Sequence, residues 1–454
     1  MMSDFLNLTY LKTVSCQDNG DHYRVTASGS LEPPVCLSCG HTSFYGHGSQ
    51  RQTYTDSPMH GKRVLIEIDR RRFRCKSCGK TVFEPLPDMD GKRQATSRLI
   101  QYVEKRCMKD TFSALSREIG IDDKTVRFIF DDYAARRQNE LQYKTPEILG
   151  IGELKIIGDY RAILTNIDKL ALFDLLPSRK KVSLLEYFGA LPDKQNVTTL
   201  VMDMWNPYRQ VGKKLFPGRL IVADRFHVVR MANEGLERVR KQIRKTVDDK
   251  TRIKLKDERF LLLKRRDSLD TEGLEKIQRW FEMFPQLGMA YEAKERFFDI
   301  YCYPTRAAAE LAANKWPNSL DPVIEKHFRD LRVALHNWHE EIFNYYDNPV
   351  TNGYTESMNN ITRFINRMGR GYSFEVLRAR LLYDEKVIKG ERSSVRKKVR
   401  KQKPSNDVWS LTIGRAIASS KDDDYECATM SDPVVNYGAD LSTLARFLEE
   451  GYFA

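Results

Sequence analysis

The spacing of apolar positions predicts a chain that passes through several kinds of structure. Between residues 91 and 137 apolar side chains recur every three or four positions, with a break at 120–123, and this pattern predicts a helix, a tight turn and a second helix. Asp122 or Asp123 is placed to cap the second helix. Residues 1–30 show only a short alternation near Tyr23, and we expect an N-terminal leader there.

Residues 145–230 have a different pattern, in which short apolar runs alternate with helical stretches. The strand-like runs are 148–151, 162–165, 198–202 and 220–222, and the helical stretches include 182–189 and 208–215. This alternation predicts an α/β core. From residue 231 to 346 the pattern is helical throughout and rich in Lys and Arg, which predicts an all-helical insertion.

A turn-like stretch at 351–354 leads into a further helical segment, so we expect the core to resume over residues 347–390. A basic linker that includes 392–403 and an acidic tail that includes 422–424 are expected over residues 391–454. The expected fold class is therefore multidomain α+β. A small cysteine-bearing domain at 31–88 and a helix-turn-helix at 89–140 precede the α/β core at 145–230, which the helical insertion interrupts.

Charge and composition narrow the class of partner. The 454 residues carry a formal net charge of +13 at pH 7 with a pI near 9.2, and a polyanion such as nucleic acid is the simplest partner for such a chain. A basic soluble protein without such a partner remains an alternative. The sequence has no run of 18 apolar residues, and its start lacks the features of a signal peptide, so we expect a cytoplasmic protein.

Four of the eight cysteines form two Cys-x-x-Cys pairs, Cys36 with Cys39 and Cys75 with Cys78, and a glycine follows each pair. Tetrahedral zinc needs four soft ligands at about 2.3 Å, and the glycines permit turns that aim backbone amides at the sulfurs. The spacing therefore predicts a zinc ribbon at 31–88 with a structural Zn²⁺. Four unliganded core cysteines are the alternative.

Two groups of side chains are candidates for contact with DNA. One is the arginine run beside the second cysteine pair, which can face phosphates or can be an ordinary solvated run: Arg70, Arg71, Arg72 and Arg74. The second group follows if residues 112–119 and 124–133 form the two helices of a helix-turn-helix. Lys124, Thr125 and Arg127 would then lie at the start of the recognition helix, where side chains reach base edges. An ordinary helical hairpin would show the same pattern.

Carboxylates lie at the ends of two apolar runs and in a later helical segment. Asp203 follows the run at 198–202, Asp224 follows the run at 220–222, and Glu356 lies in the segment 352–360. Two-metal phosphoryl transfer requires carboxylates that converge from strands and a helix, because Mg²⁺ and Mn²⁺ prefer oxygen ligands. Ordinary strand-end caps are the alternative for Asp203 and Asp224.

The order of these motifs resembles the ISL-three group of bacterial insertion-sequence transposases. The resemblance runs from Cys36 to about Lys389 and rests on the cysteine pairs, the helix-turn-helix, a Leu-Gly-Ile strand, Asp-Met-Trp-Asn-Pro-Tyr, Asp-Arg-Phe-His-Val-Val, the insertion and Asn-Gly-Tyr-Thr-Glu-Ser-Met-Asn-Asn. It implies an RNase H-like core with a DDE triad and catalytic Mg²⁺ or Mn²⁺. It also implies cleavage and transfer of double-stranded DNA, at terminal inverted repeats and a target, by a homo-oligomer on the DNA.

The resemblance also implies which residues form the triad. In an RNase H-like fold the first acid lies on the first strand, the second just after the fourth strand, and the third on a later helix. The strand-like runs make 220–222 the fourth strand, so Asp224 is implied as the second acid and Glu356 as the third, both as magnesium ligands. Asp203 is a further candidate that would support the site as an accessory residue. His227 is either accessory or an interior histidine whose hydrogen bonds are satisfied.

The chain departs from this family at the first acid. Where the family has Leu-Gly-Ile-Asp-Glu, this chain has Leu-Gly-Ile-Gly-Glu, so Gly152 stands at the position of the first metal-binding Asp. Glu153 should face away from the site, because side chains alternate along a strand unless a bulge re-aims one. We therefore expect impaired catalysis with fold and DNA binding retained. A catalytically silent or repurposed DNA-binding protein is the alternative, whereas an unrelated zinc-ribbon regulator would not need the segment 352–360.

Overall fold

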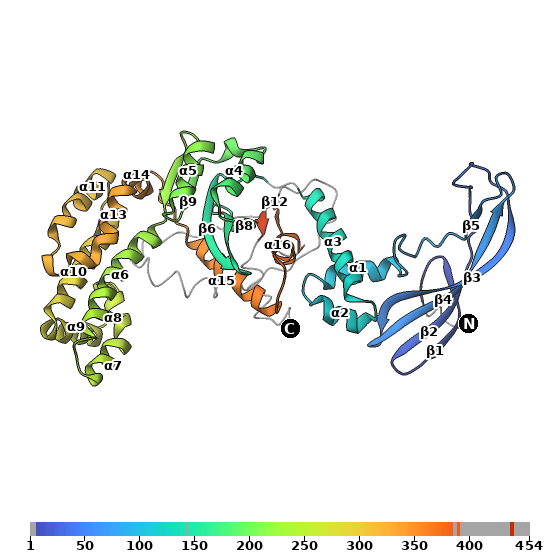
Figure 1. Cartoon of the computed structure of the whole chain (residues 1–454), viewed down its shortest axis with the longest axis horizontal. Helices are drawn as coiled ribbons and strands as arrows, with labels where there is room; N and C mark the ends of the chain where they lie inside the picture. The colour runs from blue at the N-terminus through green and yellow to red at the C-terminus, as the bar shows by residue number, and fades with distance from the viewer. Residues whose placement is uncertain (1–5, 142–143, 385–387, 391–435, 440–454) are drawn as a thin grey trace, which may run out of the picture. The chain divides into compact units, whose positions relative to one another are not determined.

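The computed structural model describes residues 6–141, 144–384, 388–390 and 436–439. They fall into two compact units, one ending at Leu141 and one starting after it (Figure 1). Each unit has its own hydrophobic core. Within these described ranges, no helix combines the length and the apolar character that crossing a bilayer requires.

The first unit contains a five-stranded sheet. Its strands are β1 (Leu11–Asp18), β2 (His22–Gly29), β3 (Phe44–Met59), β4 (Lys62–Cys75) and β5 (Thr81–Phe83), in the order β1-β2-β4-β3 with β5 beside β4. The expectation of a leader over residues 1–30 is wrong, because β1 and β2 pair with each other and β2 runs parallel to β4. The sequence signal was weak because most of β1 is exposed.

Strand β4 changes its surroundings along its length. Val64, Ile66 and Ile68 alternate into the core of the first unit together with Leu11 and Val25. Beyond Ile68, β3 and β4 continue as a paired hairpin that carries the arginine run and ends at the second cysteine pair. We call this extension the β3–β4 arm.

Three helices complete the first unit: α1 (Ser97–Arg106), α2 (Phe112–Ile119) and α3 (Asp123–Glu140). The predicted helix-turn-helix is confirmed, with α2 at the predicted residues and α3 longer than predicted. Gly120 has a φ of 78° in the turn, a left-handed conformation that glycine adopts at low cost. The Asp122 carboxylate then caps α3 by accepting a hydrogen bond from the Thr125 amide over 2.9 Å.

A seven-stranded sheet lies at the centre of the second unit. Its strands are β6 (Ile148–Ile156), β7 (Asp159–Asn166), β8 (Ala171–Leu175), β9 (Thr199–Met202), β10 (Leu220–Ala223), β11 (Ile388–Gly390) and β12 (Asn436–Ala439), in the order β10-β9-β6-β7-β8-β12-β11. Strands β6, β9 and β10 are parallel, whereas β7 is antiparallel to both β6 and β8. The predicted mixed α/β core is therefore present.

The strand count made from the sequence was one short. Strand β8 was missed because Asp174 interrupts a run of only 5 residues. In the structure the Asp174 carboxylate is buried and accepts hydrogen bonds from Arg378 over 2.7 and 2.9 Å and from the Tyr187 hydroxyl over 2.8 Å. Strand β9, and not β10, is therefore the fourth strand of the core, and the acid that follows the fourth strand is Asp203.

The C-terminal expectation is wrong in part. Strand β12, within the expected tail, pairs with β8 and β11 in the sheet. The basic run at 392–403 and the acidic run at 422–424 lie outside the described residues.

Helices cover both faces of this sheet. Helices α4 (Lys181–Ala190) and α5 (Asn206–Leu215) pack on the face that carries Leu149 and Ile151. Helix α15 (Gly353–Met368) packs on β6 from the other side, where Gly150 and Gly152 bring Thr355 close to the strand. Helix α16 (Phe374–Tyr383) packs on β8.

The predicted insertion is helical in the structure. It comprises α6 (Arg225–Ile243), α7 (Asp249–Asp257), α8 (Arg259–Leu263), α9 (Thr271–Met283), α10 (Pro285–Asp299), α11 (Arg306–Lys315), α12 (Pro322–Glu325), α13 (Arg329–Asn337) and α14 (His339–Phe343), joined in places by short 3-10 turns. These helices bury a core of their own, with Leu236, Tyr291 and Phe328 among its members. Helix α6 begins directly after β10 and so joins the sheet to the insertion (Figure 1).

Candidate metal sites and DNA-binding surfaces

The four paired cysteines meet at the end of the β3–β4 arm. Cys36 Sγ lies 3.6 Å from Cys78 Sγ, Cys39 Sγ lies 3.6 Å from Cys75 Sγ, and all four sulfurs lie within 4.8 Å of one another. Sulfurs around a tetrahedral zinc with Zn–S bonds of about 2.3 Å are about 3.8 Å apart. The cluster therefore fits a structural Zn²⁺, and four separate core cysteines would not explain this approach.

The backbone of each cysteine pair supports metal binding. The Gly40 amide donates to the Cys36 carbonyl over 2.7 Å, the Gly79 amide donates to the Cys75 carbonyl over 3.1 Å, and both glycines have a positive φ, 73° and 70°. The backbone amide of Ser38 lowers the pKa of the Cys36 thiol to about 7. Because zinc binds the thiolate, a lowered thiol pKa favours the metal-bound form.

Two of the four arginines beside the second cysteine pair form hydrogen bonds within the first unit. Arg70 Nε donates to the Glu84 carbonyl over 2.8 Å, and the Arg71 guanidinium donates to the buried Glu84 carboxylate over 2.9 Å. Arg72 is half-buried and Arg74 is exposed. Contact with phosphates stays a prediction for all four, and Arg70 and Arg71 have a structural role in holding Glu84.

Helix α3 presents an exposed stripe that begins with Lys124, Arg127 and Phe128. Thr125 is half-buried, and its hydroxyl donates to the Asp122 carboxylate over 2.6 Å, so it supports the start of the helix. Phe128 is apolar, but its side chain is 62% exposed. An exposed ring beside two cations suits contact with the methyl group of a thymine in the major groove.

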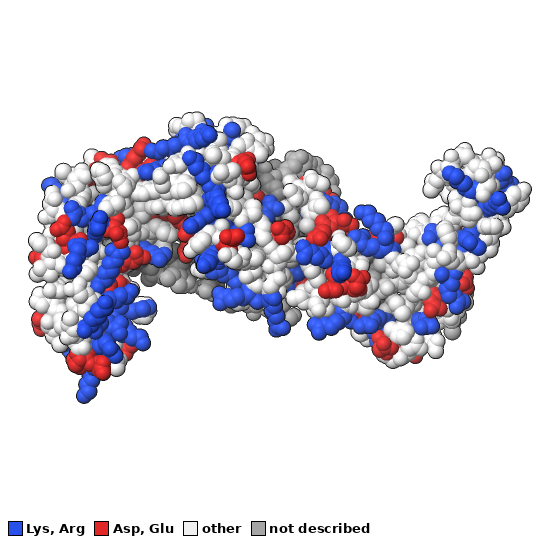
Figure 2. Space-filling model, viewed as in Figure 1, with Lys and Arg blue, Asp and Glu red and all other residues white. Residues whose placement is uncertain are grey.

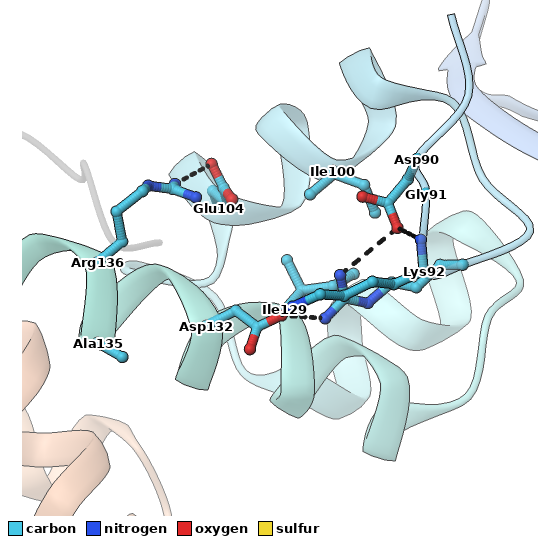
Figure 3. A pocket seen from close by; sticks show the side chains of 10 residues that line it. Asp90, Gly91, Lys92, Ile100, Glu104, Ile129, Asp132, Ala135 and Arg136 are labelled. Carbon is cyan, nitrogen blue, oxygen red and sulfur yellow. Dashed lines mark hydrogen bonds and ion pairs between the residues drawn. The ribbon is translucent and has the colours of Figure 1, made fainter. Parts of the chain in front are cut away.

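A cavity of about 460 Å³ lies between α1, α3 and the segment that precedes α1 (Figure 3). Ion pairs cross it from one element to another: Arg93 to Asp132 over 2.7 Å, and Arg136 to Glu104 over 2.9 Å. These pairs tie α3 to its neighbours and so fix the direction in which α3 presents its exposed stripe. We assign this cavity a structural role.

Three positions lie in a row across the sheet, one in the middle of β6 and two at the carboxyl ends of β9 and β10. The parallel registers align β6 with β9, and β9 with β10, as far as Met202. The next position along the chain is then Gly152 within β6, Asp203 directly after β9 and Asp224 directly after β10. Aligned residues of neighbouring parallel strands point to the same face of a sheet. Position 152 therefore belongs to the same edge of the sheet as the two aspartates.

Asp203, Asp224 and His227 form a compact group. His227 Nδ1 lies 2.9 Å from Asp224 Oδ2 and 3.2 Å from Asp203 Oδ1, and the donor atoms of all three residues lie within 4.8 Å of one another. Asn352 completes the group, because its backbone amide donates to Asp224 Oδ1 over 2.9 Å and its side-chain amide donates to Asp203 Oδ1 over 3.3 Å. His227 therefore contacts both carboxylates, and its accessory role stays a prediction.

Burial and charge set the protonation of this group. Burial raises the pKa of Asp203 to about 6, although the nearby His227 acts in the opposite direction. Burial also acts to lower the pKa of His227, but the hydrogen bond to Asp224 and the charge of Asp203 outweigh it and raise that pKa. Two carboxylates and one imidazole nitrogen at these distances fit one divalent cation.

Neighbouring side chains fill the volume that an aspartate at position 152 would need. A Cβ atom on Gly152 would lie 2.7 Å from Thr355 Cγ2 and 3.7 Å from Asn352 Nδ2. Thr355 is held there because its hydroxyl bonds to Thr165 Oγ1 over 2.6 Å and to Asn352 Oδ1 over 2.5 Å. The Gly152 carbonyl accepts a hydrogen bond from the Tyr208 hydroxyl over 3.2 Å. A two-metal centre with three carboxylates therefore does not fit these residues.

Glu356 lies near the Asp203–Asp224–His227 group. It is half-buried in the first turn of α15 and accepts a hydrogen bond from Asn359 over 3.4 Å. Its charge acts to raise the pKa of both Asp203 and His227. Glu356 thus contributes charge to the centre while its carboxylate lies outside the group of three donors.

Glu153 is held by a cation of its own. The pairing of β6 with β7 is regular through this position, so no bulge re-aims the side chain. Glu153 forms an ion pair with Arg179, whose guanidinium carbon lies 4.5 Å from the centroid of the Trp205 ring. Glu153 also lines a cavity of about 390 Å³ together with Asp203 and His227. Arg179 therefore neutralises the one carboxylate adjacent to Gly152 in sequence.

Sequence reasoning missed the roles of Asn352 and Thr355. Both lie in the segment 352–360, in which the sequence pattern pointed only to the carboxylate of Glu356. The side chain of a buried Asn has four hydrogen-bonding positions, and that of Asn352 makes three hydrogen bonds within the centre, including one to the Ile151 carbonyl over 3.1 Å. The only sequence signal was the polar content of an otherwise amphipathic helix start.

Comparison with known proteins places these sites in a family. A family model described as a transposase matches residues 149–381, one described as a zinc-finger of transposase IS204/IS1001/IS1096/IS1165 matches 32–78, and one described as a helix-turn-helix domain of transposase family ISL3 matches 84–134. The chain is also similar to the transposase for insertion sequence element IS1001 of Bordetella parapertussis. The two are 23% identical over 365 residues, which cover 78% of this chain and 89% of that protein.

Proposed function

Because this chain belongs to transposase family ISL3, we propose that it binds the terminal inverted repeats of an insertion sequence through its first unit and is impaired in cutting them. It is an insertion-sequence transposase with a zinc ribbon and a helix-turn-helix that bind DNA.

The first unit supports the recognition step. Lys124, Arg127 and Phe128 form an exposed stripe at the start of α3, the position from which a recognition helix reads base edges in the major groove. The zinc ribbon holds the β3–β4 arm rigid and leaves Arg74 exposed for a phosphate. We expect the terminal inverted repeats to be bound as paired ends by a homo-oligomer of this chain.

The second unit supports a weakened metal centre. We assign the role of the second acid to Asp203 in place of Asp224, because Asp203 follows the fourth strand of the core. Asp203, Asp224 and His227 would hold one Mg²⁺ or Mn²⁺, and Glu356 would add negative charge nearby. Such a cation, when bound, screens the charge of a DNA phosphate as it approaches the carboxylates.

One observation carries the impairment. The place of the first acid is filled by the Thr355 methyl group and the Asn352 amide, so neither a carboxylate nor open space is present at Gly152. A second cation would lack a shared carboxylate ligand. We therefore assign no cleavage step to this chain, and we expect it to occupy the ends of its element without breaking them.

The test uses the full-length chain with a duplex copied from the ends of the element that carries its gene, in Mn²⁺ and in Mg²⁺. We expect a stable complex on the end duplex, weaker binding to a scrambled duplex, and intact strands. The variant Lys124→Ala/Arg127→Ala should lose the preference for the end duplex. Strand breaks at the terminal repeat made by the wild-type chain would overturn the impairment, and equal binding of both duplexes would overturn the recognition.

A further inference from the structure

One segment of the insertion carries a large excess of positive charge, whereas the recognition helix has none in net. Helix α3 carries four Lys and Arg and four Asp and Glu, so its formal charge is zero. Residues 238–266 carry thirteen Lys and Arg against four Asp and Glu. Figure 2 shows Lys and Arg side chains gathered over the region of α6 and α8. A helix-turn-helix with a neutral recognition helix leaves most phosphate contacts to another surface.

One face of α6 runs from the carboxylate centre to this charge. Its buried residues, including Val228, Ala232, Leu236 and Val239, pack into the insertion core. The opposite face has exposed or half-buried side chains spaced by three or four residues, which places them in one line along the helix and the turn that follows it. This α6 track consists of His227, Arg230, Glu234, Arg238, Lys241 and Lys245.

The charges at the far end of the α6 track are free to bind an anion. Lys241 and Lys245 are exposed and have no acidic partner within 4.0 Å among the residues that the structure describes. Nearby acids are committed elsewhere: Asp248 caps α7 by accepting from the Thr251 amide over 3.1 Å, and Asp249 pairs with Arg252 over 3.1 Å. Binding an anion at Lys241 and Lys245 therefore breaks no ion pair.

The far end of the track is also held in place by hydrogen bonds. Arg240 donates to the Leu255 carbonyl over 2.8 Å, and Arg244 Nε donates to the Arg252 carbonyl over 3.1 Å. These arginines of α6 and its following turn fasten α7 alongside α6. A preorganised surface loses less conformational entropy when it binds a ligand.

We propose that the α6 track binds the sugar-phosphate backbone of the same duplex whose end lies at the Asp203–Asp224–His227 group. This inference rests on the proposed function. From Asp224 to Lys241 the helix advances 17 residues, about 26 Å at about 1.5 Å per residue. A duplex advances about 3.4 Å per base pair, so Lys241 and Lys245 contact phosphates about 8 base pairs from the DNA end.

The experiment measures duplex affinity as a function of salt for the full-length chain and for Lys241→Gln/Lys245→Gln. Each lost phosphate contact reduces the slope of log K against log salt by about 0.9, so the double variant should lower it by about 1.8. The preference for the end duplex over a scrambled one should not change. In phosphate ethylation interference, the wild-type chain should show interference at phosphates about 8 base pairs from the DNA end, and the double variant should not.

A matched control is Lys315→Gln/Lys326→Gln, which removes two exposed lysines of the same insertion, one at the end of α11 and one in the 3-10 turn after α12, and should leave the slope unchanged. An unchanged slope in Lys241→Gln/Lys245→Gln would overturn the α6 track. The α6 track would also be overturned if the double variant reduced the salt dependence of binding to a single-stranded RNA of equal length but not of binding to the duplex. The recognition-helix variant Lys124→Ala/Arg127→Ala separates this proposal from the proposed function. If that variant loses the preference for the end duplex, the proposed function stands even where the α6 track is overturned. If that variant keeps the preference, the proposed function itself is contradicted.

Discussion

The close packing of α15 on β6 makes a quantitative prediction for Gly152→Ala. The added Cβ atom would lie 2.7 Å from Thr355 Cγ2 and 3.3 Å from Ile163 Cγ2. Carbon atoms prefer separations of about 3.5–4.0 Å, so the first contact is short by roughly 1 Å. Overpacking of this kind in a filled core costs about 1–3 kcal/mol. We therefore expect Gly152→Ala to lower the free energy of unfolding of the second unit by that amount.

A second substitution isolates the cause. Thr355→Ser removes the methyl group that collides with the new Cβ atom and keeps the hydroxyl that bonds to Thr165 and Asn352. Alone it should cost about 0.8 kcal/mol, the value of one buried methyl group. In the Gly152→Ala background it should restore stability, so the two substitutions should be non-additive by about 1–2 kcal/mol.

The assay is urea unfolding of the wild-type chain, the two single variants and the double variant. Gly189→Ala is the control within the same unit, because no atom lies within 4 Å of its Cβ position in α4. We expect Gly189→Ala to be neutral or to stabilise by up to about 1 kcal/mol. Gly152→Ala with wild-type stability would refute the reasoning, and so would a double variant no more stable than Gly152→Ala.

Three further predictions concern the zinc ribbon, the insertion and the carboxylate centre. Cys75→Ser should release zinc, measured by elemental analysis, and abolish binding to the end duplex; retention of both would contradict the zinc assignment. Burial lowers the pKa of Lys294 to about 8, so the free energy of unfolding should rise by up to about 3 kcal/mol as the pH increases from 8 to 10.5. Lys294→Met should lack this rise in denaturation curves, and an equal rise in the variant would contradict the burial. Asp203→Asn should weaken Mn²⁺ binding, followed by electron paramagnetic resonance, at least tenfold, whereas Asp168→Asn, an exposed carboxylate on a turn, should leave it unchanged.

Local signals made the first unit largely predictable. The cysteine pairs carry their own glycines, and the helix-turn-helix has caps and a turn glycine within a few residues, so Gly120 and Asp122 marked its boundaries. The strands β1 and β2 were not predicted, because most of β1 is exposed and the strands are held by pairing, β1 with β2 and β2 with the distant β4.

The candidate site depends on contacts between residues that lie far apart in the sequence. Asp174 looked like a break in a strand because its partner, Arg378, lies 204 residues away. With β8 missed, β10 was counted as the fourth strand, and the second acid was therefore expected at Asp224. The absence of an acid at Gly152 was visible in the sequence. Its consequence was not, because Thr355 and Asn352 reach that volume only through the packing of α15 on β6.

The most direct test of the account compares strand cleavage of the end duplex in Mn²⁺ by the wild-type chain and by Gly152→Asp/Thr355→Ser, which restores the first acid and makes room for it. The account predicts that both chains bind the duplex and that only the double variant breaks it at the terminal repeat. Equal cleavage by both chains would contradict the claim that Gly152 disables the centre. Bound but intact DNA with the double variant would contradict the assignment of position 152, Asp203 and Glu356 as the triad.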